Sequence, residues 1–208
     1  MRKNIIYSLL LVVAALFAGC ESRLDIEKHG NMGDQDDFYQ TDEQTEQAVA
    51  SMYSSLKGLY YNWFFTKNLL SDDVWCGGGQ RGDNTSLEQL NEYTYGTDNG
   101  MIQGVFSGLY GLIYQSNLVI EKVADDTPAK KRAIAEAKFF RAWANFELVT
   151  LWGTAPLVDH LLKPGEYRQG NSTPEALWAA VESDLNDAIS MNALPSKKNK
   201  DDQETGMR

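Results

Sequence analysis

The chain has 208 residues, 43% of them hydrophobic and 11% aromatic, which is enough to bury one core. Its 19 basic and 29 acidic residues give a formal net charge of −10. A surface of that sign repels phosphate backbones and anionic headgroups, so the composition argues against nucleic acid as a partner.

The first twenty residues have the pattern of an exported lipoprotein. Two basic residues precede an apolar run from Ile5 to Phe17, which is shorter than the about 20 apolar residues of a membrane-spanning helix and suits a secretory signal. Small residues then lead into Cys20, as in a lipobox, although Phe17 stands where Leu is usual. We predict a lipoprotein signal peptide over residues 1–19 and acylation of Cys20. The alternative is an ordinary signal peptide that happens to contain a cysteine.

We predict that residues 20–40 form the lipidated cysteine and a polar tether, and that residues 41–208 form a helical domain. If Cys20 is acylated, Cys76 is the one cysteine left and has no partner for an intrachain disulfide. The domain must then depend on its hydrophobic core for stability.

Two helices are predicted in the first half of the domain. Thr41 and Gln44 form a capping box at the start of a helix over residues 42–56, and Gly58 is its expected stop. A second helix is expected over residues 101–124. Its three internal glycines weaken helix propensity by up to about 1 kcal/mol each, but they could offer a thin face for close helix packing. These glycines are Gly104, Gly108 and Gly111.

The third predicted helix runs over residues 128–152, with Thr127 as its cap and Pro128 in its first turn. It carries two apolar stripes and one narrow polar strip, so we expect it to be buried between neighbours. The stripes are Phe139, Trp143 and Phe146, and beside them Phe140, Ala144 and Leu148; the polar strip is Lys138, Arg141 and Asn145.

A fourth helix begins at Thr173 and Pro174 and continues to about residue 191. Its expected apolar face is Leu177, Val181, Leu185 and Ile189. Residues 91–95 and 157–159 give a weak signal for a short pair of strands. The pattern predicts an all-α, tetratricopeptide-like helical scaffold with long irregular loops, truncated after residue 208.

No enzyme or metal motif emerges. His29 and His160 are the only histidines and have no companions at ligand spacing, which argues against a zinc site. The loop over residues 71–84 is more informative, because loops carry binding function and this one mixes an aromatic ring with polar groups. An aromatic ring suits the apolar face of a sugar, and carboxylate, amide and guanidinium groups suit its hydroxyls. The candidates are Asp72, Asp73, Trp75, Arg81 and Asn84, although Trp75 could instead fold into the domain while the polar residues cap turns.

Three segments together resemble one family. They are residues 24–27 after the predicted lipid-bearing cysteine, residues 37–41 leading into the first helix, and residues 136–158. The chain resembles the N-terminal part of the SusD/RagB family of nutrient-uptake outer-membrane lipoproteins, over less than half of a complete member. Met207 departs from the Gly-Arg pair with which that family enters its next helix.

The resemblance implies helix pairs of tetratricopeptide type, glycan-holding surface loops, no cofactor and no cleavage of the ligand. It also implies a partner, a SusC-like TonB-dependent barrel over which the lipoprotein closes as a lid. Family glycan sites draw on the loop matching residues 71–84, where Asp72, Asp73 and Arg81 fall on polar positions. The stretch over residues 76–79 departs from the usual loop, which leaves the glycan class open.

The sequence therefore predicts a lipid-anchored, surface-exposed outer-membrane protein that captures oligosaccharide or glycoconjugate and passes it to a SusC-like transporter. Two other functions stay open. A continuous apolar groove between helices would favour an envelope scaffold that binds protein or peptide. A converging carboxylate pair in a cleft would favour a lipid-anchored hydrolase.

Overall fold

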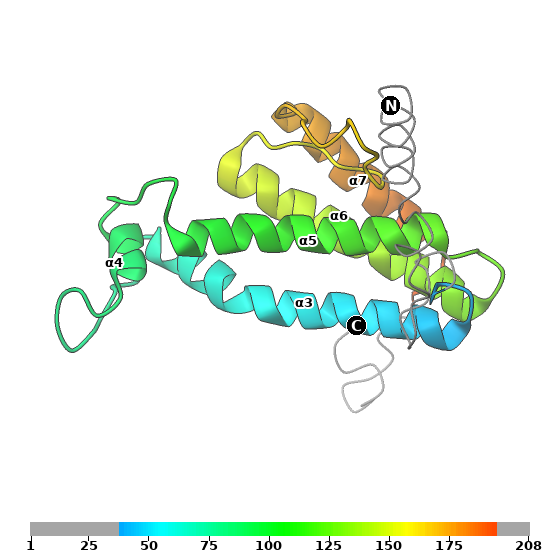
Figure 1. Ribbon diagram of the computed structural model, residues 1–208, viewed down its shortest axis with the longest axis horizontal. Helices are drawn as coiled ribbons and strands as arrows, with labels where there is room; N and C mark the ends of the chain where they lie inside the picture. The colour runs from blue at the N-terminus through cyan, green and yellow to red at the C-terminus, as the bar shows by residue number, and fades with distance from the viewer. Residues whose placement is uncertain (1–37, 195–208) are drawn as a thin grey trace, which may run out of the picture. The chain divides into compact units, whose positions relative to one another are not determined.

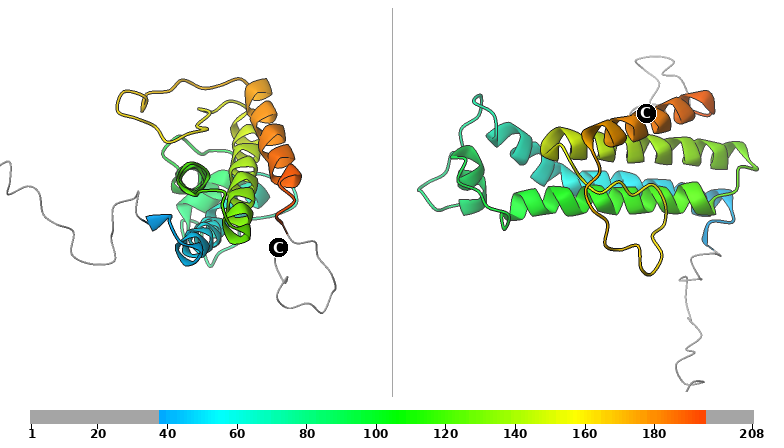
Figure 2. Two further views of the ribbon diagram at one scale, coloured as in Figure 1. Left: turned by 90° about the vertical axis from the view of Figure 1, so that its right-hand side faces the viewer. Right: turned by 90° about the horizontal axis from the view of Figure 1, so that it is seen from above.

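The computed structural model describes residues 38–194, so the predicted signal peptide, Cys20 and most of the predicted tether lie outside the described residues. Five helices make up the described part: α3 (Asp42–Leu69), α4 (Thr85–Asn91), α5 (Gly100–Lys122), α6 (Pro128–Trp152) and α7 (Pro174–Ser190). Each of the four long helices, α3, α5, α6 and α7, runs antiparallel to the next long helix in the chain, as Figures 1 and 2 show. The predicted all-α class is confirmed. Within residues 38–194, no helix is long and apolar enough to cross a membrane.

The predicted strand pair is wrong. Residue 91 is the last of α4, residues 92–93 form a turn and residues 94–95 are irregular. The one β contact in the described part is an isolated bridge between Ala155 and Ser172. The bridge ties the segment after α6 to the residue just before the α7 cap. Phe38 and Tyr39, the first two described residues, both contact the main core.

Helix α3 begins as predicted and ends later than predicted. The capping box is present, with the Gln44 backbone N–H donating to the Thr41 hydroxyl at 3.2 Å and the Thr41 N–H donating to the Gln44 side chain at 3.0 Å. Gly58 does not stop the helix, which continues to Leu69. A helical glycine costs about 1 kcal/mol, whereas burying a leucine contributes about 1.5–3 kcal/mol, and both Leu59 and Leu69 are buried.

Two of the three α5 glycines form the expected thin face. A Cβ at Gly104 would collide with the Asn62 amide, and a Cβ at Gly108 would lie 2.8 Å from Cδ1 of Leu59, so both glycines let α5 approach α3 closely. A Cβ at Gly111 would meet no neighbouring helix within 4 Å, so Gly111 takes no part in this contact.

Helix α6 packs against α3, α5 and α7 and is the central element of the stack. Phe140, Ala144 and Leu148 are buried, which confirms one predicted stripe. The other stripe is partly wrong, because Phe139 is 47% exposed and Phe146 is 37% exposed. Phe140 and Leu148 belong to the main core instead, and the Phe146 ring packs edge-to-face against Trp178 of α7.

Two residues of the polar strip of α6, Arg141 and Asn145, are buried and the third, Lys138, is partly buried, contrary to what a polar strip suggests. The guanidinium of Arg141 donates from Nε and Nη2 to the two carboxylate oxygens of Asp184 in α7, each at 2.7 Å. Its Nη1 donates to the Asn117 side chain in α5 at 2.8 Å and to the Asp159 carbonyl at 2.6 Å. One side chain therefore joins three helices and the loop between α6 and α7.

This ion pair also sets the buried face of α7. Leu177 and Val181 are buried as predicted, but Ile189 is 74% exposed. The buried positions after Val181 are Asp184 and Ala188, one residue earlier than the expected Leu185 and Ile189. The helix is rotated so that Asp184 reaches Arg141.

Candidate functional site

The predicted binding loop is built on a short helix that the sequence pattern did not reveal. Helix α4 is capped by Asn84, whose side-chain oxygen accepts from the Leu87 N–H at 3.3 Å. Leu87 and Leu90 are buried in a second apolar cluster with Leu69 and Met101. This cluster fixes α4 at the end of α3 and the start of α5.

Polar side chains of α4 and its flanking residues give the loop a defined shape. The Asn91 side chain accepts from the Cys76 N–H at 3.0 Å and donates to the Val74 carbonyl at 3.2 Å. Glu88 accepts from the Gly82 N–H at 2.7 Å. Asp83 accepts from two backbone N–H groups, those of residues 79 and 80, at 2.6 and 2.9 Å. These bonds lower the conformational entropy that a ligand would otherwise have to remove on binding.

A pocket of about 250 Å³ opens between this loop and α4. Trp75 lines this pocket, and 79% of its surface is exposed, the highest value among the large hydrophobic residues of the described part. The Arg81 guanidinium lies on the pocket and pairs with the Glu92 carboxylate at 2.7 Å. The pocket thus combines one accessible indole face with charged hydrogen-bonding groups.

The structure brings together two of the five candidate residues. Trp75 and Arg81 line the pocket. Asp72 and Asp73 are exposed on the same loop but do not line it, and Asn84 caps α4. The pocket is also lined by Gln80, Glu88 and Glu92, which were not predicted from the sequence. The available signal was Asn84 as a cap followed by leucines three residues apart, a pattern too short to stand out.

A family described as "Starch-binding associating with outer membrane", the SusD-like family, matches residues 27–205. The chain belongs to the SusD-like family. Among curated relatives it is 32% identical to a SusD-like protein of Bacteroides ovatus, over 73% of this chain and 29% of that protein. It is 27% identical to SusD-like protein P2 of Formosa agariphila, over 77% of this chain and 34% of that protein.

Solved structures of SusD-like proteins share the fold. A laminarin binding SusD-like protein superposes with a TM-score of 0.67 at 27% identity, over 74% of this chain and 34% of that one. A SusD superfamily protein from Bacteroides vulgatus gives the same TM-score at 24% identity, over 78% of this chain and 36% of that one. The chain spans about a third of the length of the SusD-like proteins it matches.

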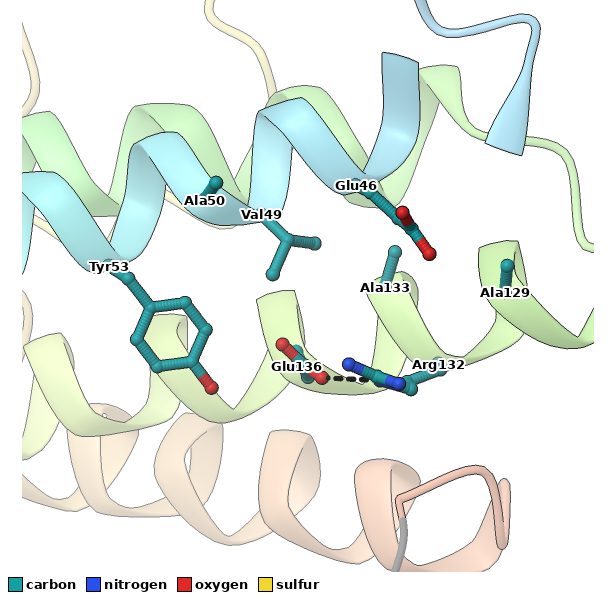
Figure 3. A pocket seen from close by; sticks show the side chains of 8 residues that line it. All are labelled: Glu46, Val49, Ala50, Tyr53, Ala129, Arg132, Ala133 and Glu136. Atoms are coloured by element: carbon teal, nitrogen blue, oxygen red, sulfur yellow. Dashed lines mark hydrogen bonds and ion pairs between the residues drawn. The ribbon is translucent and has the colours of Figure 1, made fainter. Parts of the chain in front are cut away.

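This SusD-like chain carries a second recessed surface, between α3 and α6. Figure 3 shows its first part, a pocket of about 280 Å³ where Arg132 donates to Glu136 at 2.8 Å. The other oxygen of Glu136 is buried and has no hydrogen-bond partner within residues 38–194. Farther along the same two helices lies an apolar pocket of about 320 Å³. It is lined by Leu56, Leu59, Tyr60, Trp63, Phe139, Phe140 and Trp143.

The loop between α6 and α7 contains a histidine held between two carboxylates. His160 Nδ1 lies 2.7 Å from Asp159 Oδ1, and its Nε2 lies 3.4 Å from Glu166 Oε2. The hydrogen bond with Asp159, and then that with Glu166, raises the pKa of His160. The pKa of Asp159 is lowered chiefly by the His160 hydrogen bond, and that of Glu166 chiefly by the Lys163 backbone N–H.

These pKa shifts predict a pH-dependent loop. The contribution of protonated His160 to the stability of this loop is complete below the ordinary histidine pKa of about 6.5. It is lost as the pH rises through the higher pKa that His160 has in the folded chain. The contributions of Asp159 and Glu166 to that stability are present above the ordinary carboxyl pKa of about 4. They are lost as the pH falls through the lower pKa values that these groups have in the folded chain. We therefore expect the hydrogen-exchange protection factor of the Lys163 amide, which donates to Glu166 at 2.7 Å, to fall as the pH rises above about 6.5. In a His160→Asn variant the protection should not change over that range, and constant protection in the wild type would contradict the prediction.

Proposed function

We propose that this chain is the capture-site part of a lipid-anchored, surface-exposed outer-membrane protein that binds oligosaccharide without cleaving it. In this proposal residues 1–19 are removed as a signal peptide, acyl chains on Cys20 anchor the protein, and a SusC-like TonB-dependent transporter receives the ligand. The observation that carries the proposal is the exposed Trp75 beside a polar pocket, in a chain of the SusD-like family.

The chemistry of the pocket suits a sugar. The Trp75 indole can lie against the C–H face of a sugar ring, while Gln80 and Arg81 offer donors to its hydroxyls. Asp72 and Asp73 are exposed on the same loop and would contact a ligand that extends beyond the pocket. One stacked ring contributes about 1 kcal/mol beyond burial, so we expect weak recognition spread over several contacts.

The same groups argue for binding rather than hydrolysis. Glu88 and Glu92 both line the pocket, but Glu88 accepts from the Gly82 N–H and Glu92 pairs with Arg81. Each carboxylate thus has a structural role in holding the loop. Burial, followed by the charges of Glu88 and Glu92, raises the pKa of the Cys76 thiol, which keeps it protonated and poorly nucleophilic.

Isothermal titration of the chain with malto-oligosaccharides, laminari-oligosaccharides and an acidic oligogalacturonate tests the proposal. We expect heat with at least one of them, and about a tenfold weaker Kd for Trp75→Ala, equivalent to about 1.4 kcal/mol. Tyr167→Ala is the matched control, since Tyr167 is 68% exposed on the loop between α6 and α7. Absence of heat with every oligosaccharide, or an unchanged Kd for Trp75→Ala, would refute glycan capture at this pocket.

The groove between α3 and α6 favours a second candidate function, binding of a polypeptide helix. Its apolar part offers rings on two neighbouring helices but few groups to pair with sugar hydroxyls, which suits the apolar face of an amphipathic helix. The titration separates the two functions, because a chain that binds no oligosaccharide leaves this groove as the better candidate surface.

A further inference from the structure

The two pockets between α3 and α6 follow one another along the same two helices. On α3, residues 46–53 line the polar pocket and residues 56–63 line the apolar pocket. On α6, the corresponding ranges are 129–136 and 139–143. The lined face of α3 extends over roughly 26 Å, at about 1.5 Å per residue. The groove is therefore long enough to hold several turns of another helix.

The apolar part of the groove exposes large rings of both helices. Tyr60 of α3 is 55% exposed, and Phe139 of α6 is 47% exposed. Beside them, Leu56, Trp63 and Trp143 are partly buried against the main core. Apolar surface that is exposed together on neighbouring elements marks a site of interaction.

In the polar part of the groove, Glu136 has an acceptor oxygen without a donor. Glu136 is 5% exposed, and Arg132 donates to its Oε1 at 2.8 Å. Its Oε2 has no hydrogen-bond partner within residues 38–194. Figure 3 shows Val49 and Tyr53 of α3 pointing toward this carboxylate. A buried carboxylate oxygen without a donor is unfavourable, so this position favours a ligand that brings one.

A similar buried carboxylate of α6 is paired with a lysine of α3. The Glu147 side chain is 2% exposed, and the Lys67 ammonium donates to its two oxygens at 2.9 and 3.3 Å. None of the residues that line the polar pocket is a lysine, and Glu46 adds a second carboxylate beside Glu136. With Arg132 as the one cation, this lining has an excess of negative charge. The chain thus supplies a lysine for Glu147 and none for Glu136.

A lysine suits the free oxygen of Glu136 better than an arginine. Because Arg132 already donates to one oxygen, a single oxygen is left for a ligand. The arginine fork matches two oxygens, whereas the lysine ammonium is a compact charge at the end of a flexible apolar stem. That stem can lie along Val49 and Ala133, which line the same pocket.

We propose that this groove binds an amphipathic helix of another polypeptide, whose apolar face covers the exposed rings and whose single lysine donates to Oε2 of Glu136. The proposal rests on the second candidate function, binding of a polypeptide helix, and is independent of glycan capture at Trp75. Charge favours a partner that carries a lysine, because the formal net charge of the chain is −10 and a second copy would bring the same sign.

Fluorescence anisotropy of labelled synthetic peptides, titrated with the chain, tests the proposal. The probe is an amphipathic helix of about 18 residues, which matches the length of the groove. It has a leucine face, a glutamine face and one lysine at the end of the leucine face. Matched peptides carry norleucine or arginine in place of the lysine. We expect the lysine peptide to bind about tenfold more tightly than the norleucine peptide, with the arginine peptide between them.

Three variants of the chain locate the contact. Glu136→Gln keeps an acceptor for Arg132 and should abolish the difference between the lysine and norleucine peptides. Glu182→Gln changes an exposed residue of α7 outside the groove and should leave that difference intact. Phe139→Ala should weaken both peptides about tenfold, because they lose the ring on which they pack. Circular dichroism of each variant checks that its helices are intact.

The outcomes separate this proposal from the function on which it rests. Equal affinities of the lysine and norleucine peptides would overturn the lysine contact and leave helix binding standing, and so would tightest binding by the arginine peptide. This comparison uses the unchanged chain, so it does not depend on the folding of a variant. Absence of binding by every peptide would overturn the second candidate function together with the proposal, while the oligosaccharide titration decides glycan capture separately.

Sedimentation velocity of the chain alone tests the other occupant, a second copy. We expect a monomer. A dimer that Phe139→Ala dissociates would show that a second copy fills the groove, which would overturn the proposal.

Discussion

Replacing Arg141 with methionine is expected to lower the free energy of unfolding by about 3–5 kcal/mol, the cost of removing one partner of a buried ion pair. Asp184 is 5% exposed and would be left with an uncompensated charge, while Asn117 and the Asp159 carbonyl would each lose a donor. Urea denaturation followed by circular dichroism measures the loss. Because α7 is held to α6 through this pair, we expect α7 to become the least protected helix in hydrogen exchange.

The adjacent pair provides the control. Lys138 on α6 pairs with Asp187 on α7 at 2.6 Å, and the Asp187 side chain is 54% exposed. Lys138→Met should cost no more than about 1 kcal/mol, as measured for exposed ion pairs. A double variant, Arg141→Met with Asp184→Leu, should regain most of the stability, because an apolar pair can replace a buried ion pair. Similar losses for Arg141→Met and Lys138→Met would contradict the buried network.

Phe140→Ala is expected to destabilise the chain by about 3–5 kcal/mol, as for other large-to-small substitutions in a core. Phe140 is 2% exposed and lies edge-to-face against Tyr53 of α3 with ring centroids 4.8 Å apart. The neighbouring residue of the same type is the matched control. Phe139 is 47% exposed, so Phe139→Ala should cost about 1 kcal/mol, half or less of the value for burying a phenylalanine.

Thermal and urea unfolding of the two variants measure this difference. Equal losses would mean that Phe139 is as buried in solution as Phe140, which would restore the predicted stripe of Phe139, Trp143 and Phe146. A larger loss for Phe139→Ala would reverse the burial of the two rings and contradict the packing of α6.

The binding surface could be predicted only in part. The loop over residues 71–84 was predicted from its mixture of an aromatic ring with polar groups, and the structure places Trp75 and Arg81 of that loop on one pocket. The partners of the loop could not be predicted, because Asn91 and Glu92 are the last residue and the C-cap of a helix with only two buried leucines. Two apolar positions are too few for a periodic signal.

Local hydrogen bonds and side-chain spacing in the sequence by themselves determined where three helices begin. Thr41, Thr127 and Thr173 each accept from a backbone N–H three residues on, and a bond of that span needs no tertiary partner. Only the tertiary structure decided how far α3 continues and which face of α6 is buried. A helix that is apolar over most of its circumference does not specify its own orientation. For α6 that choice came from Asp184, 43 residues away in sequence, whose carboxylate makes the burial of Arg141 favourable.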